Sequence, residues 1–231
     1  MRKYKILKTR FIRIQNGRTK LYRIKALKDF ADVKKGDIGG FVESENNLSQ
    51  DADCWIYDDA KVFDNAMICD NAKIKDEARV FQNAKVFDRS IIKDEARVYG
   101  YGTISHDAKV YGHAKVSGSS RVFDYAQVFD HAVILSSAVI SNHATVRENA
   151  KVGEFASIYE ESDVFGDAVI LGNSRLEGCS KIYGNAKLEK KFRFRNADIS
   201  SPYDITSLDL YEYKFHFFLI EKLKNLIIAF I

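Results

Sequence analysis

The strongest constraint on this chain is a hydrophobic residue that returns at every sixth position from Ile56 to Leu188 without a break. A small residue sits two positions before each of them, as Ala60 does before Val62. An apolar stripe on an α-helix recurs every three or four residues, so a period of six excludes a helix. Two inward positions spaced two apart fit a short strand. The stretch 53–190 therefore predicts short strands that bend at every repeat.

The other two outward positions of each hexad predict a corner. They hold pairs such as Asp64-Asn65 and Gly112-His113, and Gly, Asn and Asp are the residues that tolerate a left-handed backbone. The motif Asp-Glu-Ala-Arg-Val at 76–80 returns at 94–98, eighteen residues later. Three hexads therefore make one coil, and the chain is expected to wind as a triangular prism.

This pattern resembles the hexapeptide-repeat, left-handed parallel β-helix family, in which a small residue follows an aliphatic one by four positions, as in Val62 to Ala66 and Val110 to Ala114. The left-handed turn is implied by this resemblance alone. The expected fold is an all-β solenoid, a left-handed parallel β-helix of seven to eight coils with an N-terminal β-hairpin cap and a C-terminal α-helix. Residues 21–27 and 39–49 also resemble the N-terminal segment of phage- and prophage-borne members of the family.

Four segments are expected along the chain. They are a basic β-hairpin, a turn-rich N-terminal cap, the β-helix and a C-terminal extension, over residues 1–28, 29–52, 53–190 and 191–231. The hexad phase ends after Lys190, and from about Thr206 the apolar spacing becomes helical. This predicts a capping helix, with a membrane-surface or partner helix as the alternative, and the segment is too short and too charged to span a bilayer.

Charge is distributed unevenly along the chain. Eleven cations precede the first acid, Asp29, and the rest of the chain has more acids than cations. Asn16-Gly17 predicts a hairpin with a three-residue loop, in which Ile12 and Ile14 share a face with Tyr22 and Ile24. Cations beside aromatic and aliphatic groups suit an anionic partner such as nucleic acid, unless they fold back onto the acidic first coils. The hairpin residues predicted to contact that partner are Phe11, Arg13, Arg18, Lys20, Arg23 and Lys25.

The eighteen-residue period sorts the outward side chains onto three walls, of which one is the most adhesive. Its aromatic residues either stack as structural ladders or form a contact surface for a protein partner or a second copy. The resemblance implies trimers that associate through a wall. The residues predicted for this wall are Lys61, Phe63, Arg79, Phe81, Arg97, Tyr99, Val133, Leu135, Val169 and Leu171.

The acidic corners Asp59, Glu77 and Glu95 lie along one edge of the predicted prism. Because cations stand two residues further along each strand, a solvated salt-bridge ladder is expected there in preference to a divalent-cation site. No metal and no cofactor are predicted. The three cysteines form no CxxC pair and no signal peptide is visible, which predicts a cytoplasmic protein.

Two functions remain open from the sequence. The favoured one is a non-catalytic binding protein that grips a protein or nucleoprotein partner. The phage resemblance implies an accessory inhibitor of a host factor or defence complex. The alternative, implied by the family, is an acyltransferase that uses acyl-coenzyme A, with His113 and His131 at one corner of adjacent coils as the candidate bases. No loop interrupts the repeats to build a pocket, which favours binding.

Overall fold

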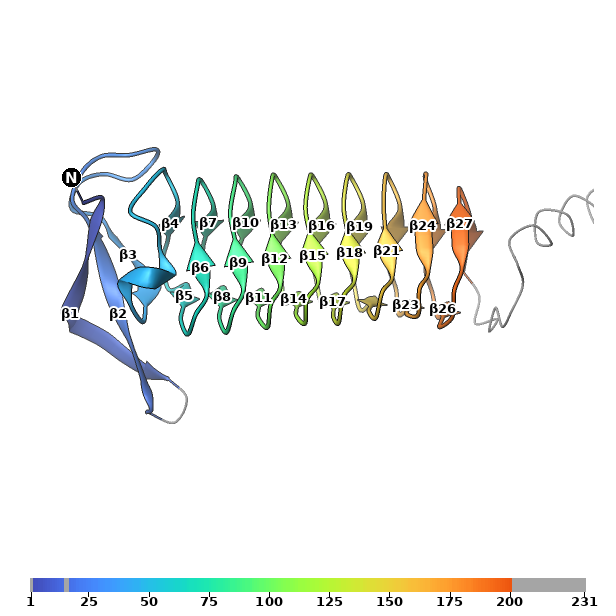
Figure 1. The fold of residues 1–231 in the computed structure, drawn as a ribbon, viewed down its shortest axis with the longest axis horizontal. Helices are drawn as coiled ribbons and strands as arrows, with labels where there is room; N and C mark the ends of the chain where they lie inside the picture. The colour runs from blue at the N-terminus through green and yellow to red at the C-terminus, as the bar shows by residue number, and fades with distance from the viewer. Residues whose placement is uncertain (1, 15–16, 201–231) are drawn as a thin grey trace, which may run out of the picture.

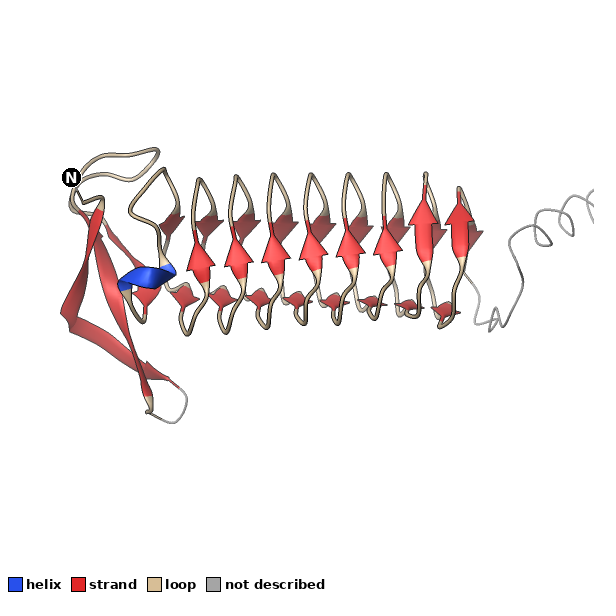
Figure 2. Cartoon of the chain, in the orientation of Figure 1, coloured by secondary structure: helices blue, strands red, loops and turns tan. Residues whose placement is uncertain are grey.

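The computed structural model describes residues 2–14 and 17–200, which form an all-β solenoid with an antiparallel hairpin at its N-terminal end (Figures 1 and 2). Each hexad contributes a strand of about two residues followed by a corner, as the sequence predicts. The inward pair of each hexad is fully buried, as Ala60 and Val62 illustrate. The apolar residues that recur at every sixth position therefore line the inside of the solenoid.

Three sheets form the three walls of the prism. The first wall continues into the hairpin and contains β3 (Ile38–Val42), β5 (Lys61–Val62), β8 (Arg79–Val80), β11 (Arg97–Val98), β14 (Lys115–Val116), β17 (Val133–Ile134), β20 (Lys151–Val152), β23 (Val169–Ile170) and β26 (Lys187–Leu188). The second contains β4 (Trp55–Ile56), β7 (Lys73–Ile74), β10 (Ile91–Ile92), β13 (Lys109–Val110), β16 (Gln127–Val128), β19 (Thr145–Val146), β22 (Asp163–Val164), β25 (Lys181–Ile182) and β28 (Asp198–Ile199). The third contains β6 (Met67–Ile68), β9 (Lys85–Val86), β12 (Thr103–Ile104), β15 (Arg121–Val122), β18 (Val139–Ile140), β21 (Ser157–Ile158), β24 (Arg175–Glu177) and β27 (Arg193–Arg195).

The solenoid has about nine turns, so the expected seven to eight coils is too low. At the start, Val42 pairs in parallel with Val62, twenty residues later, and this longer coil breaks the sequence phase. At the end, Phe194 pairs with Leu176 at the regular interval of eighteen, so the register persists beyond Lys190. The predicted C-terminal helix lies outside the described residues.

The corners are held by a ladder of side-chain hydrogen bonds. The first corner residue has a positive φ, such as 56° at Asp76 and 58° at Asp94. Its side chain accepts a hydrogen bond from the backbone N–H at the same corner of the next coil: Asp94 N to Asp76 Oδ2 is 3.1 Å, and Gly112 N to Asp94 Oδ2 is 2.9 Å. Asp, Asn, Gln and Glu serve this role at other corners. These corner acids are therefore structural.

The hairpin pairs β1 (Tyr4–Ile14) with β2 (Thr19–Ala26) in a register that differs from the expected one. Ile14 pairs with Thr19, so four residues separate the strands in place of three. Ile12 therefore lies opposite Leu21, and Phe11 lies opposite Tyr22. The predicted grouping of Ile12 and Ile14 with Tyr22 is wrong because of this register. An irregularity between Leu7 and Phe11 shifts the pairing again nearer the start of β1.

The N-terminal end of the solenoid is closed by side chains from three segments. The ring of Trp55 packs edge-on against Tyr4 and Phe30. The ammonium group of buried Lys3 donates to the backbone carbonyls of residues 51, 52 and 54. The short 3-10 helix η1 (Glu45–Asn47) contributes Asn47, whose amide donates to two carbonyls of the next coil. These contacts satisfy polar groups that an open solenoid end would leave unpaired.

The loop after the hairpin is anchored to the second wall by Asp32. Its carboxylate accepts hydrogen bonds from the Tyr57 hydroxyl at 2.7 Å and the Lys73 ammonium at 3.0 Å. The Tyr57 hydrogen bond, together with Lys73, lowers the pKa of Asp32 to about 2. The loop therefore stays ion-paired at neutral pH.

The corner ladder predicts a graded response at Asp94. The Asp94→Ala variant loses both the acceptor and the tolerance for a positive φ, so we expect the free energy of unfolding to fall by about 1–3 kcal/mol. Asp94→Asn keeps both properties and should stay close to wild type. Urea unfolding followed by circular dichroism measures the difference. Equal urea midpoints for the Ala and Asn variants would contradict a contribution of the corner hydrogen bonds to stability.

Candidate partner-binding wall

The outer face of the first wall carries a row of four basic side chains on consecutive coils. Lys61 pairs with Arg79, Arg79 with Arg97 and Arg97 with Lys115 in the parallel register. Neighbouring strands lie ~4.8 Å apart, so the four residues span roughly 14 Å along the solenoid axis. We call these four residues the cation row.

Aromatic side chains form a second row beside it. Phe63, Phe81 and Tyr99 stand two residues after the first three cations, and their rings stack with centroids 5.0 Å apart and planes within 7° of parallel. We call these three residues the aromatic ladder. Its first ring, Phe63, also packs with Phe41 and Leu21, so the ladder continues into the cap and the hairpin.

The cation row lacks the acidic partners that the sequence predicts. Within residues 2–14 and 17–200, no ion pair joins its members to Glu77 or Glu95. Asp59 instead pairs with Arg23, and Glu95 lies 3.4 Å from the Nδ1 atom of His113. The expected ladder therefore does not form as direct ion pairs, although the Asp59 and Glu77 carboxylates act electrostatically on Lys61.

Lys61 has both like and opposite charges nearby. Burial, and then the neighbouring Arg79 cation, lower the pKa of Lys61, while the Asp59 and Glu77 carboxylates act in the opposite direction. Its ammonium donates to the Asp59 backbone carbonyl at 2.8 Å. In the described residues, no group of His, Cys, Asp or Glu side chains is placed to hold a metal ion.

The predicted hairpin residues fall into two groups. Arg23 turns toward the solenoid, where its guanidinium lies 3.9 Å from the Phe41 ring centroid and donates to the Asp59 carboxylate. Phe11, Arg13 and Lys20 lie on the other face, with both cations within 6 Å of the Phe11 ring centroid. The fold-back alternative therefore describes Arg23, and the exposed face is smaller than predicted. Arg18 is exposed at the turn and Lys25 is half-buried opposite Lys5.

The aliphatic part of the predicted wall lies further along the same sheet. Val133 and Val169 alternate with lysines in the strand register, at Lys115, Lys151 and Lys187. Leu135 and Leu171 are half-buried and meet over Gly153, where an added Cβ would lie 2.9 and 3.0 Å from their side chains. The two leucines thus cover a position that has no side chain. We call Val133, Leu135, Val169 and Leu171 the aliphatic patch.

The candidate catalytic histidines come together as the coil period predicts. The His113 and His131 rings stack with centroids 4.8 Å apart and planes 4° from parallel. Both side chains are exposed at the corner. Neither lines the hollow beside η1 or the smaller hollow beside Arg23 and Asp59.

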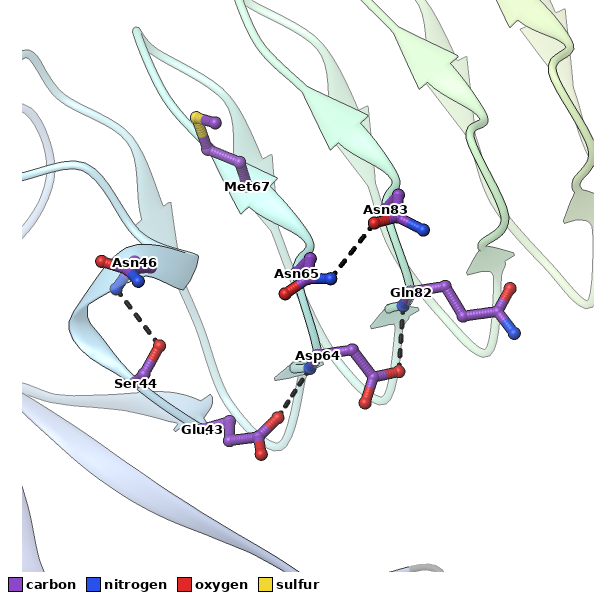
Figure 3. Close-up of a pocket in the computed structure, with 8 residues that line it drawn as sticks. All are labelled: Glu43, Ser44, Asn46, Asp64, Asn65, Met67, Gln82 and Asn83. Atoms are coloured by element: carbon purple, nitrogen blue, oxygen red, sulfur yellow. Dashed lines mark hydrogen bonds between the residues drawn. The ribbon is translucent and has the colours of Figure 1, made fainter.

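The larger hollow lies beside η1 and is shown in Figure 3. Its polar side chains are already committed to the fold: Glu43 accepts from Asp64 N, Asp64 accepts from Gln82 N, and Asn65 donates to Asn83. A set of corner groups bonded to one another offers no reactive centre. We therefore place the candidate site on the first wall.

Comparisons with known proteins give limited support. No protein-family model matches the chain. An uncharacterised acetyltransferase of Escherichia coli K12, YdcK, is 40% identical over 74 residues, which is 29% of this chain and 23% of that protein. The match thus spans less than a quarter of the relative's length. Together with the repeat, it supports a β-solenoid with weak similarity to the hexapeptide-repeat type. The described residues contain no helix that is long and apolar enough to cross a membrane.

Sequence reasoning missed the part that the cap plays in this wall. Phe41 pairs with Lys61 in the first wall, and the partly buried Ile12 and Ile14 pack against the cluster of Leu21, Phe41 and Phe63. Ile38, Phe41 and Val42 are residue types that favour strands, but Gly39-Gly40 interrupts them and the twenty-residue interval to β5 hides their phase. The wall therefore begins in the hairpin.

An unpaired row of like charges should cost stability. We expect Arg79→Gln to raise the urea midpoint at low salt, because it relieves repulsion from the adjacent Lys61 and Arg97. The gain should vanish near 1 M NaCl, where such interactions are screened. Arg147→Gln is the matched control, since Arg147 pairs with Asp163 at 2.9 Å and its loss should lower the midpoint. A lower midpoint for Arg79→Gln at low salt would contradict the unpaired row.

Proposed function

We propose that this chain is a non-catalytic binding protein that grips a protein or nucleoprotein partner through the first wall. The observation that supports this proposal is the cation row, which forms no ion pair within the described residues and lies beside the aromatic ladder. The basic side chains on successive coils repel one another, and binding of an anionic partner would reduce this repulsion. The identity of the partner as a host factor stays a prediction from the resemblance.

The shape of the surface supports binding to a macromolecule. A stack of short strands joined by hydrogen-bonded corners is a rigid, flat surface, which suits a large partner more than a small molecule. Association then orders few side chains, because the Phe63, Phe81 and Tyr99 rings are already stacked. The exposed hairpin face, with Arg13 and Lys20 over Phe11, is a second contact region that nucleic acid suits.

Charge reversal tests the wall. We expect the double variant Arg79→Glu/Arg97→Glu to weaken capture of the native partner from a host extract by at least about tenfold. Lys85→Glu/Arg121→Glu changes the net charge equally on the third wall and should bind like wild type. Capture is quantified by mass spectrometry of cross-linked complexes. Equal losses for the two variants would remove the first wall from the proposal.

Acyl transfer is a second candidate, and the similarity to YdcK favours it over the first. The stacked His113 and His131 rings would supply the general base, with Glu95 near His113 as an orienting carboxylate. Both rings are exposed, so a second copy would have to complete the site. The hexapeptide-repeat resemblance implies such a seam between subunits.

The acyl-transfer candidate predicts binding and turnover of acetyl-coenzyme A. His113→Ala/His131→Ala should then abolish acetyl transfer to an amine acceptor, with unchanged circular dichroism. Titration calorimetry with acetyl-coenzyme A measures binding and a free-thiol assay measures turnover. His106→Ala is the matched control, because His106 lies at a different corner. Wild-type protein that binds no acetyl-coenzyme A would exclude this candidate.

Two finer features of the fold are also proposals. We propose a left-handed turn of the solenoid, as the hexapeptide-repeat resemblance implies. We further propose self-association through the aliphatic patch, since apolar side chains that gather on a wall usually mark a contact surface and Leu135 and Leu171 meet over Gly153. The half-buried Leu135 and Leu171 support this placement.

A further inference from the structure

The hairpin and the first wall together form a corner on the surface. In Figure 1 the outer half of the hairpin extends beyond the edge of the solenoid on which β5, β8 and β11 lie. Ile12 and Ile14 on this half pack against the cluster of Leu21, Phe41 and Phe63, and Phe81 packs against the same cluster. Apolar side chains of the hairpin thus adjoin the start of the aromatic ladder. The cation row runs beside both.

The orientation of the aromatic rings restricts which partner fits. The rings of Phe63, Phe81 and Tyr99 face one another along the solenoid axis. The faces of Phe81 are covered by its two neighbours and Phe63 is buried, so the ladder presents mainly the ring edges of Phe81 and Tyr99 to the partner. Bases of single-stranded nucleic acid bind by stacking on exposed ring faces. The ladder is therefore a poor platform for bases.

Ring edges and cations favour the same kind of group. The edge of an aromatic ring carries the positive end of its quadrupole, so it attracts carboxylates as the cation row does. The two rows stand two residues apart on each strand, which is ~6.6 Å. The aromatic edges and the hairpin isoleucines also offer apolar area. A matching partner presents acidic groups beside apolar ones.

We infer that the first wall binds an acidic, amphipathic segment of a partner protein, with carboxylates along the cation row and apolar side chains along the aromatic ladder and the hairpin corner. This inference rests on the proposed binding function and specifies its partner. A row of roughly 14 Å matches between two and three turns of an α-helix at 1.5 Å per residue.

A second copy of this chain is a poorer occupant of the same surface. A symmetric contact through this wall places the same patch of both copies together, so Arg79 and Arg97 would face their own counterparts. Like charges brought together at an interface oppose association. The aliphatic patch, which lies on later coils, is the part of the wall that suits self-association.

The test uses three labelled probes and fluorescence anisotropy with the full chain. The probes are a ~14-residue helical peptide with a Glu stripe beside a Leu stripe, the same peptide with Ser in place of Leu, and a ~20-nucleotide oligo-dT. We expect the Glu/Leu peptide to bind at least about tenfold more tightly than the Glu/Ser peptide. Arg79→Glu/Arg97→Glu should remove most of this binding, and Lys85→Glu/Arg121→Glu should not.

Tyr99→Ser separates the apolar contribution from the charge. Tyr99 is the half-buried end of the ladder, so the variant should fold, as its urea midpoint would verify. We expect it to weaken the Glu/Leu peptide several-fold and to leave the Glu/Ser peptide unchanged. Equal affinities of the wild-type protein for the two peptides would overturn the inference that the bound segment is amphipathic.

The possible failures identify which proposal is wrong. Oligo-dT binding that depends on Arg79 and Arg97, without peptide binding, would overturn the acidic protein segment while the binding wall stands. If no probe binds and capture of the native partner is also insensitive to Arg79→Glu/Arg97→Glu, both the acidic-segment inference and the proposed binding function are wrong. Peptide binding that ignores both charge reversals would overturn the inference as well.

Discussion

The structure depends on the exact stacking of one coil on the next at an interval of eighteen residues. Backbone hydrogen bonds such as Lys61 N to Ala78 O, at 2.9 Å, join the strands. At the corners, where the backbone turns through a positive φ, carboxylates such as Asp76 and Asp94 accept the next coil's N–H. The corner therefore adds a side-chain bond to a stack of strands only two residues long. Without it the register would rest on backbone hydrogen bonds alone, which include corner bonds such as Glu77 N to Asp94 O, at 3.0 Å.

Strict stacking also explains the composition of the walls. Every outward side chain lies directly above the one eighteen residues earlier, so similar residues form rows. Some rows are internally satisfied, as when Arg147 pairs with Asp163 and lies 4.0 Å from the Phe165 ring centroid. The cation row is different, because within the described chain it gains no ion pair. An oppositely charged partner would therefore relieve repulsion along the cation row.

The two candidate functions use different parts of this surface. Binding relies on the first wall near the hairpin, whereas acyl transfer relies on the corner of His113 and His131. Rings stacked at 4.8 Å are what the coil repeat produces at any corner with two aromatic residues, so the pair needs no catalytic explanation. The similarity to YdcK nevertheless keeps acyl transfer as a candidate. His113 and His131 line neither the hollow beside η1 nor the one beside Arg23 and Asp59.

The sequence by itself determined the solenoid, its three walls and the residues that share each row, because a period of six and a period of eighteen leave no other regular packing for Ala60, Val62 and their equivalents. Only the tertiary structure decided how the ends join this repeat. The longer coil before β5 and the four-residue hairpin loop shift the phase, so Phe41, Ile12 and Ile14 entered the wall unpredicted. The tertiary structure also decided which charges pair, since Asp59 forms an ion pair with Arg23 of the hairpin, which is distant in sequence. Sequence spacing reports neighbours within the repeat, whereas contacts between the cap and the repeat depend on the three-dimensional path of the chain.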